Sequence, residues 1–327
     1  MTRTPAVGRT LLASLSLDLD NLWSYLKTYG DPAWQSLPTY LPTVVPRFLE
    51  LFDEASLTAT VFVVGQDTEV EENAEPIASI AAAGHEIGNH SFSHEPWLRT
   101  YSRERIVDEL ARTEEGLQRV TGRRPLGFRG PGYSLSSTLL EVLCERGYAY
   151  DASTLPTWIG PLARTYYFRT ARLDADERGR RRELFGRAKD GLRPLRPYRW
   201  QVPGGSLVEL PVTTMPGVRL PIHFSYVLFL HGVSPALAKA YFRTALRACR
   251  LARVGPSLLL HPLDLLDATD APGTSFFPGM GLPARDKAAV VRWCLRQLQA
   301  QFHVVGTGAH VEALAVGALP GRRVTDE

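Results

Sequence analysis

The sequence predicts a single α/β domain, a distorted (β/α) barrel of seven or eight parallel strands that spans residues 1–327. Two observations predict this fold. Short apolar runs typical of strands alternate with longer amphipathic stretches, and such alternation favours parallel βαβ units. Polar residues of chemical interest follow several of the apolar runs, as in barrels that build their active sites at the carboxyl ends of strands.

The expected elements follow one another in the order that a βα repeat requires. Strands are expected at residues 11–20, 58–65, 85–90, 125–130, 148–153, 206–213, 256–261 and 302–307. Helices are expected where apolar residues recur at helical spacing, at residues 43–55, 75–84, 103–122, 137–147, 235–254 and 284–301. Residues 158–204 are rich in arginine, proline and aromatic residues and break the alternation, so we expect an insertion or lid there.

Composition excludes several classes of protein. With 37 basic and 34 acidic residues the formal net charge is only +3, which does not support nucleic-acid binding. Three cysteines without a CxxC spacing argue against a zinc ribbon, a redox pair or a disulfide framework. The N-terminal apolar run is interpreted as a strand and not as a signal peptide, and no apolar run reaches about eighteen residues. We therefore expect a cytoplasmic protein without a transmembrane segment, with peripheral membrane contact and the oligomeric state left open.

Two aspartates end the first expected strand, in the run SLSLDLD. Because side chains alternate along a strand, Asp18 and Asp20 share one face, and Leu15, Leu17 and Leu19 share the other. The leucines are expected to face the helices, which leaves both carboxylates in the mouth of the barrel. Two like charges at this spacing favour a cation or guanidinium between them, although a solvated pair at a strand end is the alternative.

The run NHSFSH places two histidines four residues apart at the end of the third expected strand. His90 and His94 would lie on one side of a turn, as a metal requires, and Asp20 would complete a set typical of catalytic zinc sites. Zinc is the first choice, and Co²⁺, Ni²⁺ or another divalent transition metal also suits these ligands. His85, five residues before His90 on a strand, is expected to face away and to be structural.

Three further polar residues fall at the ends of later strands. Arg129 precedes a Gly-Pro-Gly turn, Asp151 ends the strand YAYDAS, and His261 ends the strand PSLLLH, with Asp264 close behind it. Each alone is compatible with a structural role. Together with the aspartates and His90 they predict one active site at the carboxyl edge of the barrel.

These motifs, in their order, resemble the polysaccharide deacetylases, the family with the NodB-homology domain that is also called carbohydrate esterase family 4. The matching runs are SLDLD, HSFSH, RGPGY, DASTLPTW and LLLHP, and the resemblance covers residues 11 to about 310. It implies a barrel fold and a metal held by Asp20, His90 and His94.

The resemblance also implies the catalytic roles. Asp18 matches the base, Arg129 the residue that orients the base, His261 the acid and Asp151 the partner of the acid, and Trp158 matches the aromatic residue of the fourth motif.

Two motifs depart from the commonest form of the family. Leu19 separates the two aspartates, which are usually adjacent, and Gly132 follows the proline where Tyr or Phe is common, with Tyr133 one place later. The backbone amide of Gly132 or Tyr133 is expected to bind the oxyanion of the intermediate. The first departure is seen in less typical branches of the family, including intracellular deacetylases and allantoinase-like amidases.

We therefore expect a metal-dependent hydrolase that removes an N-acyl group, foremost N-acetyl, from an amino sugar in a glycan, glycolipid or glycan precursor. Trp23, Trp97, Trp158 and Tyr25 are candidates for stacking on the sugar, although all are equally compatible with a core role. The arginines between residues 178 and 199 form either a solvated surface or a clamp for a phosphate-bearing substrate. The alternatives are an allantoinase-like amidase that cleaves a non-sugar amide, and a non-catalytic glycan-binding module.

Overall fold

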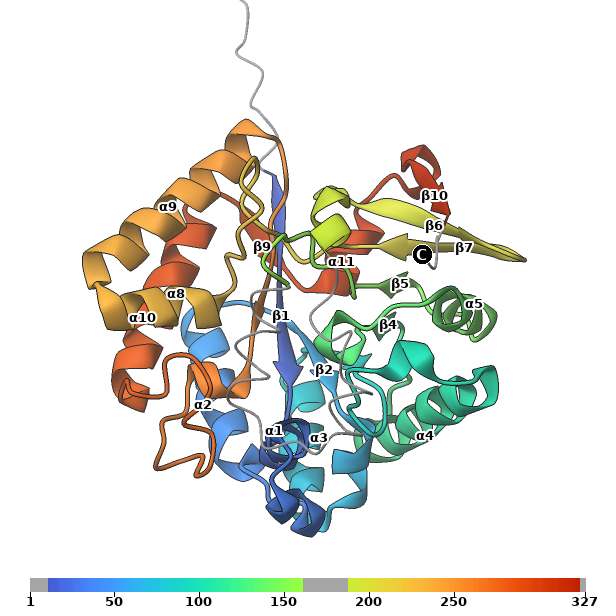
Figure 1. Ribbon diagram of the computed structural model, residues 1–327, viewed down its shortest axis with the longest axis horizontal. Helices are drawn as coiled ribbons and strands as arrows, with labels where there is room; N and C mark the ends of the chain where they lie inside the picture. The colour runs from blue at the N-terminus through green and yellow to red at the C-terminus, as the bar shows by residue number, and fades with distance from the viewer. Residues whose placement is uncertain (1–10, 161–187, 324–327) are drawn as a thin grey trace, which may run out of the picture.

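β1 (Leu12–Leu19) is the central strand of the sheet in this computed structural model, which describes residues 11–160 and 188–323 (Figure 1). It pairs in parallel with β2 (Thr60–Val63) and β8 (Ser257–Leu260), and its first residues pair with β9 (His303–Val305). The carboxyl end of β1 therefore lies between the carboxyl ends of two parallel neighbours, as the expected active site requires.

The remaining strands extend the sheet beyond β2. In their order across the sheet they are β3 (Glu86–Asn89), β4 (Gly127–Phe128), β5 (Tyr150–Asp151), β7 (Gly205–Glu209), β6 (Tyr198–Val202) and β10 (Gly321–Arg323). The strand pairs are parallel except β6 with β7. This mixed α/β fold with a mostly parallel sheet confirms the predicted barrel-like architecture.

The expectation that all strands are parallel is wrong at one end of the sheet. The turn at Gly204, whose φ of +83° suits glycine, returns the chain antiparallel, so β6 and β7 form a hairpin. In the described part of the chain no ladder joins this hairpin to β8, and the barrel stays open there. The extended segment after β7 bridges part of the gap, because Thr213 N donates to Ser257 O at 2.9 Å.

The six predicted helices are present. They are α2 (Leu41–Glu54), α3 (Ala74–Ala82), α4 (Arg103–Thr121), α5 (Ser137–Glu145), α9 (Pro235–Leu251) and α10 (Ala284–Gln299). The sequence analysis missed α1 (Leu22–Tyr29), α8 (Phe224–Val233) and α11 (Thr307–Glu312). α1 has clear end signals, since the Asn21 side chain accepts from Leu22 N and Gly30 takes the left-handed conformation at the other end.

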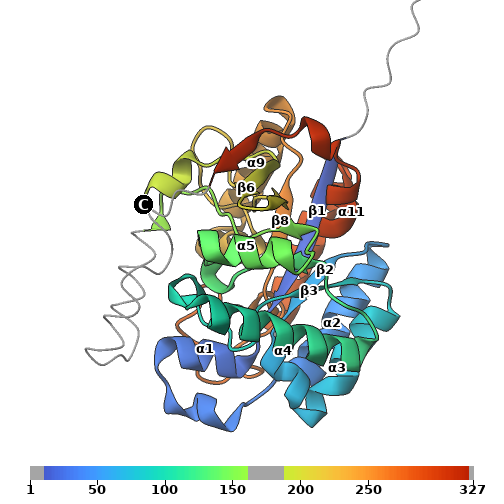
Figure 2. The ribbon, with the colours of Figure 1, turned by 90° about the vertical axis from the view of Figure 1, so that its right-hand side faces the viewer.

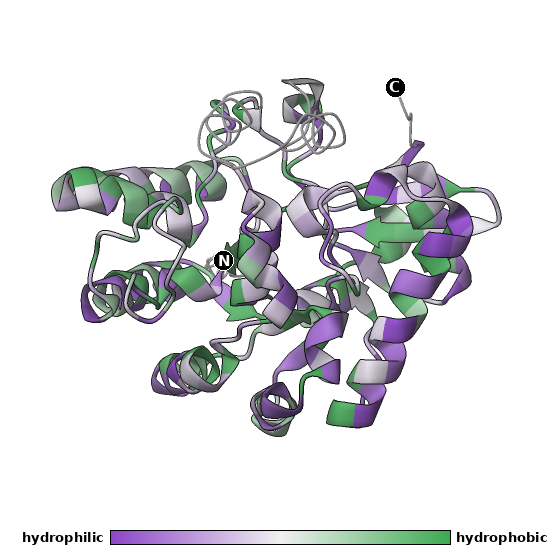
Figure 3. Cartoon of the chain, turned by 60° about the horizontal axis from the view of Figure 1, so that its bottom comes forward, coloured by the Kyte–Doolittle hydropathy of each residue, from purple (hydrophilic) through white to green (hydrophobic). Residues whose placement is uncertain are grey.

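The main core lies between β1 and the helices that cover it. Leu15, Leu17 and Leu19 are at most 1% exposed and belong to one apolar cluster with residues of α2, α9 and α10. On the other side of β1, α4 and α5 lie next to each other and are in contact (Figure 2). The helices surround the strands, and each helix carries both hydrophobic and hydrophilic residues (Figure 3). The predicted alternation of faces along β1 is therefore confirmed for the leucines.

The structure describes only part of the arginine-rich segment that was expected to form an insertion or lid. Residues 161–187, with most of the arginine run, lie outside the described residues. Residues 198–202 form β6 inside the sheet, so the end of the expected insertion at residue 204 is wrong. The prolines and arginines around these residues obscure a strand whose Tyr198 and Trp200 are buried.

None of the described helices combines the length and the apolar character needed to cross a bilayer. The most apolar helix, α8, has only 10 residues.

Candidate active site

Three side chains converge at the carboxyl ends of β1 and β3. Asp20 follows β1 by one residue, His90 follows β3 directly, and His94 lies in the loop beyond it. The Asp20 Oδ1 atom lies 3.2 Å from His90 Nε2 and 3.0 Å from His94 Nε2. One potential ligand atom from each residue lies within 4.8 Å of the others, and all three residues are buried. The structure thus brings the predicted metal ligands together.

The hydrogen bonding of these residues fits a bound cation. His90 Nδ1 lies 2.6 Å from Arg129 O, and because a carbonyl only accepts, Nδ1 carries the proton and Nε2 presents its lone pair to Asp20. A lone pair that faces a carboxylate is unfavourable unless a cation or proton lies between them. The Asp20 Oδ1 atom and His94 Nδ1 are buried and have no conventional hydrogen-bond partner among the described residues. A set of two imidazoles and one carboxylate suits a divalent transition metal.

The electrostatic environment of Asp20, His90 and His94, here called the triad, also favours a bound cation. Burial alone would raise the pKa of Asp20, but His94 and His90 outweigh it and hold this pKa well below its usual range. Burial lowers the pKa of His90, but the hydrogen bond with Asp20 and the charges of Asp18 and Asp20 together raise this pKa above its usual value. Without a metal, Asp20 therefore favours a proton on His90, and a metal would compete for the same position.

The loop that carries His94 is held in an uncommon conformation. His94 has a φ of +49° and Ser91 a φ of +60°, in the left-handed region where such residues cost about 1–3 kcal/mol each. Glu109 of α4 supports the loop from behind, since its Oε2 accepts from Phe92 N at 2.9 Å and from Ser93 N at 2.8 Å. Strain that the surroundings hold in place is typical of functional sites.

Asp18 lies beside the triad on the same face of β1. Arg129, which is 0% exposed, donates from Nη1 to Asp18 Oδ1 at 2.5 Å and to Ser16 Oγ at 2.8 Å. It also donates from Nε to Ala152 O at 3.0 Å, and its guanidinium group lies 4.4 Å from the centre of the Phe62 ring. The predicted guanidinium partner of the aspartates is therefore in place, and it is bound so firmly that it orients one carboxylate oxygen.

The turn after Arg129 determines which of the two expected backbone amides, those of Gly132 and Tyr133, can bind the oxyanion. Tyr133 N donates to Gly130 O at 2.9 Å, so the Tyr133 amide is used within the turn and is not free for a substrate. No such bond involves the Gly132 amide in the described residues, and both Gly132 and Tyr133 have positive φ angles, 57° and 61°. Of the two predicted amides, only that of Gly132 remains available.

The structure does not pair Asp151 with His261. The His261 Nδ1 atom lies 3.1 Å from Ser225 Oγ of α8, and Asp264 Oδ2 accepts from the backbone nitrogen of His261 at 2.8 Å. Asp151 instead accepts from Ser153 Oγ and contacts Glu209 of β7. Both carboxyl groups are fully buried, and burial raises the pKa of each. The predicted partnership of the acid is therefore wrong in this structure.

Two polar groups near the site were not predicted: the hydroxyl of Tyr25, which was expected only as a stacking aromatic residue, and the ring of His223. The Tyr25 hydroxyl is buried, has no hydrogen-bond partner among the described residues and feels the charges of Asp20, Asp264 and Asp18; burial raises its pKa well above the usual range, so it stays a donor. His223 caps α8 with its ring centre 5.9 Å from that of His261. His223 lies within the apolar run PIHFSYVLFL, which carries no pattern typical of a polar site.

The predicted aromatic residues divide into two groups. Trp23 is 0% exposed and donates to Asp67 Oδ1 at 2.8 Å, so the expectation that it contacts the substrate is wrong. Trp97 is partly buried in the loop beyond His94, and Trp158 is 42% exposed near the start of the undescribed segment. His85 lies at the opposite end of β3, where its Nδ1 accepts from Ala59 N at 3.2 Å.

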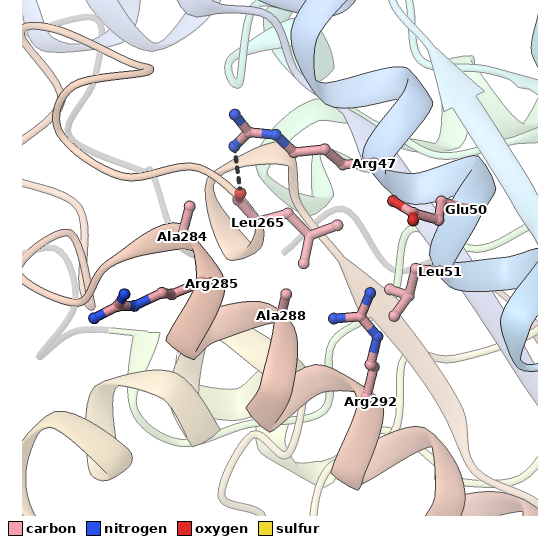
Figure 4. A pocket seen from close by; sticks show the side chains of 8 residues that line it. All are labelled: Arg47, Glu50, Leu51, Leu265, Ala284, Arg285, Ala288 and Arg292. Carbon is pink, nitrogen blue, oxygen red and sulfur yellow. Dashed lines mark hydrogen bonds between the residues drawn. The ribbon is translucent and has the colours of Figure 1, made fainter.

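A pocket between α2 and the start of α10 lies apart from this site (Figure 4). Its floor is apolar and arginines line its rim, but Arg47 pairs with Asp270 at 2.6 Å and Arg292 pairs with Glu54 at 2.6 Å. Figure 4 shows Arg47 also directed at Leu265, whose carbonyl accepts from it. None of the predicted site residues lines this pocket, so it has no evident part in the chemistry.

An open, barrel-like α/β fold with an Asp-His-His cluster that could hold a metal at its carboxyl edge defines the class of this protein. The comparisons with known proteins narrow this class. Residues 29–150 match the family model described as polysaccharide deacetylase, the family that the motifs resemble. The matched part includes His90, His94 and Arg129 but neither aspartate of β1 nor His261.

Among curated proteins, the peptidoglycan deacetylase of Helicobacter pylori is 32% identical over 168 residues, which are 50% of this chain and 55% of that protein. The chitin deacetylase of Colletotrichum lindemuthianum is 29% identical over 118 residues, 35% of this chain and 47% of that protein. The chain thus aligns with about half the length of the curated relatives it matches. A solved structure of a polysaccharide deacetylase candidate from Mycobacterium smegmatis superposes with a TM-score of 0.63 at 23% identity, over 99% of this chain and 97% of that one.

Proposed function

We propose that this protein is a metal-dependent deacetylase that hydrolyses the N-acetyl group of an amino sugar in a glycan. One observation carries the proposal. The ion pair of Asp18 with the fully buried Arg129 lies next to the cluster of Asp20, His90 and His94, so a candidate base and a candidate metal site share one edge of the sheet.

Asp20, His90 and His94 would hold the metal, which when bound supplies a Lewis acid for the acyl carbonyl and for an attacking water. Asp18 accepts a proton from that water. Arg129 holds Asp18 through one carboxylate oxygen, which leaves the other oxygen for the proton. A base of this kind is typically worth ~10²–10⁴-fold in rate.

His261 donates a proton to the departing amine, since an amide nitrogen leaves only after protonation. The negative charge on the former carbonyl oxygen needs donors on the protein side. The Gly132 amide and the Tyr25 hydroxyl are the groups that the described residues leave free for this purpose.

The relatives are named for peptidoglycan and for chitin, both polymers of N-acetylated sugars. We infer that the substrate of this protein is of the same class, either such a polymer or a smaller glycan, glycolipid or glycan precursor. Neutral N-acetylglucosamine oligomers of increasing length and isolated peptidoglycan distinguish the polymer from the precursor.

The test is acetate release by metal-loaded protein on these substrates, with Asp18→Asn as the matched control. Acetate formed by the wild type and not by the variant supports the proposal. Ammonia or a carbamoyl product from a ureide would indicate the allantoinase-like alternative. No turnover on any substrate, in a protein that binds metal stoichiometrically, would leave the glycan-binding alternative.

A further inference from the structure

We propose that Ser225 and Asp264 position His261 and determine which of its ring nitrogens carries a proton, the role that the family resemblance gives to Asp151. This inference rests on the proposed function, in which His261 is the acid. The three residues come from two elements, the end of β8 with the turn that follows it and the first turn of α8.

The contacts of His261 leave little freedom to its ring. Nδ1 lies 3.1 Å from Ser225 Oγ, and the ring centre lies 6.1 Å from that of Phe277. Nε2 has no hydrogen-bond partner among the described residues and is not buried, so this nitrogen remains for the substrate. With Nδ1 donating to Ser225 Oγ, the proton that leaves for the amine is the one on Nε2, and no other group has to change its charge.

Asp264 completes the chain of contacts. Its Oδ2 accepts from His261 N at 2.8 Å, and its other oxygen is buried without a hydrogen-bond partner in the described part of the chain. Burial raises the pKa of Asp264, and the positive charge of a protonated His261 and the hydrogen bond from Ser225 oppose this rise. Once Ser225 Oγ accepts from His261, its own hydrogen can turn only toward an acceptor, and the Asp264 carboxylate is the acceptor beside it.

The turn that carries Asp264 is fixed from behind by a buried cation. Lys287 of α10 is 0% exposed and donates to Leu263 O at 2.8 Å and to Leu266 O at 2.7 Å. Its charge favours the ionised form of Asp264. The backbone of His261 therefore holds the Asp264 carboxylate directly, and Lys287 fixes the turn that carries it.

Other titratable groups near His261 do not supply the same function. His223 packs against it with ring centres 5.9 Å apart, but burial, His261 and Arg129 hold the pKa of His223 well below its usual range, so this ring stays neutral. Asp151 shares its environment with Glu209 and makes no hydrogen bond to His261. Asp264 is thus the carboxylate placed to stabilise a protonated His261.

The test is ¹⁵N NMR of the histidine rings in metal-free protein, with the His261 signals assigned from a His261→Gln sample. The variants are Ser225→Ala, Asp264→Asn and, for comparison, Asp151→Asn. We expect Ser225→Ala and Asp264→Asn to change the proton distribution between Nδ1 and Nε2 of His261, and Asp151→Asn to leave it unchanged. Ser225→Thr, which keeps the hydroxyl, should restore the wild-type signals.

Kinetics give a second readout on an N-acetyl sugar. Loss of a neutral hydrogen bond in Ser225→Ala should lower kcat about 3- to 10-fold with KM unchanged, and loss of the charge in Asp264→Asn should lower it roughly 10- to 100-fold. Unchanged His261 signals in Ser225→Ala, or a change confined to Asp151→Asn, would overturn the inference. If the wild-type protein deacetylates no sugar, the proposed function is wrong. The NMR comparison still shows whether Ser225 and Asp264 or Asp151 position the His261 ring.

Discussion

Replacing Arg129 with methionine tests whether a buried guanidinium holds the base in place. The substitution keeps the length of the aliphatic stem and removes the charge. Asp18 then loses its partner at 2.5 Å, and Ser16 Oγ and Ala152 O lose their donors at 2.8 and 3.0 Å. All three contacts lie where Arg129 itself is fully buried.

The expected loss of stability follows from this burial. Removing one partner of a buried ion pair costs about 3–5 kcal/mol, because the remaining charge is left without compensation. Whole domains are stable by only about 5–15 kcal/mol, so the variant should unfold at a much lower urea concentration. Adding Asp18→Asn to Arg129→Met should recover part of this loss, since the amide carries no charge.

The measurement is urea unfolding of the metal-free proteins, followed by circular dichroism. Arg47→Met is the matched control: Arg47 also forms an ion pair, with Asp270 at 2.6 Å, but its side chain is 36% exposed. Such a pair contributes only about 0–1 kcal/mol. Equal losses in the Arg129 and Arg47 variants, or no recovery in the double variant, would refute the argument that burial makes the Asp18–Arg129 pair special.

Three further predictions concern the metal, the base and a buried lysine. Asp20→Asn, His90→Ala and His94→Ala should each lose stoichiometric metal in elemental analysis, while His85→Ala retains it; full occupancy in folded His94→Ala would contradict the triad. Asp18→Asn should keep its metal and lose ~10²–10⁴-fold in kcat, because an amide does not accept the proton of water; near-normal turnover would exclude it as the base. Burial lowers the pKa of Lys287 from 10.5 to about 8, so the folded protein binds fewer protons than the unfolded chain between these values. Stability of the wild type should therefore gain from this residue as pH rises from 8 to 10.5, a gain that urea unfolding should not find in Lys287→Met.

Much of the fold could be predicted because the spacing of apolar residues along the sequence indicates which face of a helix or strand is buried. The alternation in β1 and the amphipathic pattern of α4 are local signals, and both elements lie where expected. The β6–β7 hairpin could not be read in the same way. Its first strand follows a run of arginines and prolines, and its place in the sheet depends on pairing with distant residues. α8 was missed because it is apolar on nearly all sides and shows no helical period.

The grouping of Asp20, His90 and His94 and the Asp18–Arg129 pair could be predicted because these residues lie at or just beyond the carboxyl ends of strands, and the carboxyl ends of parallel strands meet at one edge. The surroundings of His261 could not. Ser225 lies 36 residues before it in a helix that carried no expectation, so only the three-dimensional structure brings the two together. The Tyr133 amide was likewise a plausible donor until the turn showed its bond to Gly130 O.

The partner of His261 follows from where the positive charges lie. Asp18 has Arg129 at 2.5 Å, and Lys287 favours the ionised form of Asp264. Asp151 and Glu209 contact each other and form no salt bridge with a described cation, and burial raises both pKa values. Two carboxyl groups in contact without a cation retain a proton between them. Such a pair has too little net charge to stabilise a protonated imidazole. Burial raises the pKa of Asp264 as well, but Lys287 favours its ionised form and its Oδ2 accepts from His261 N.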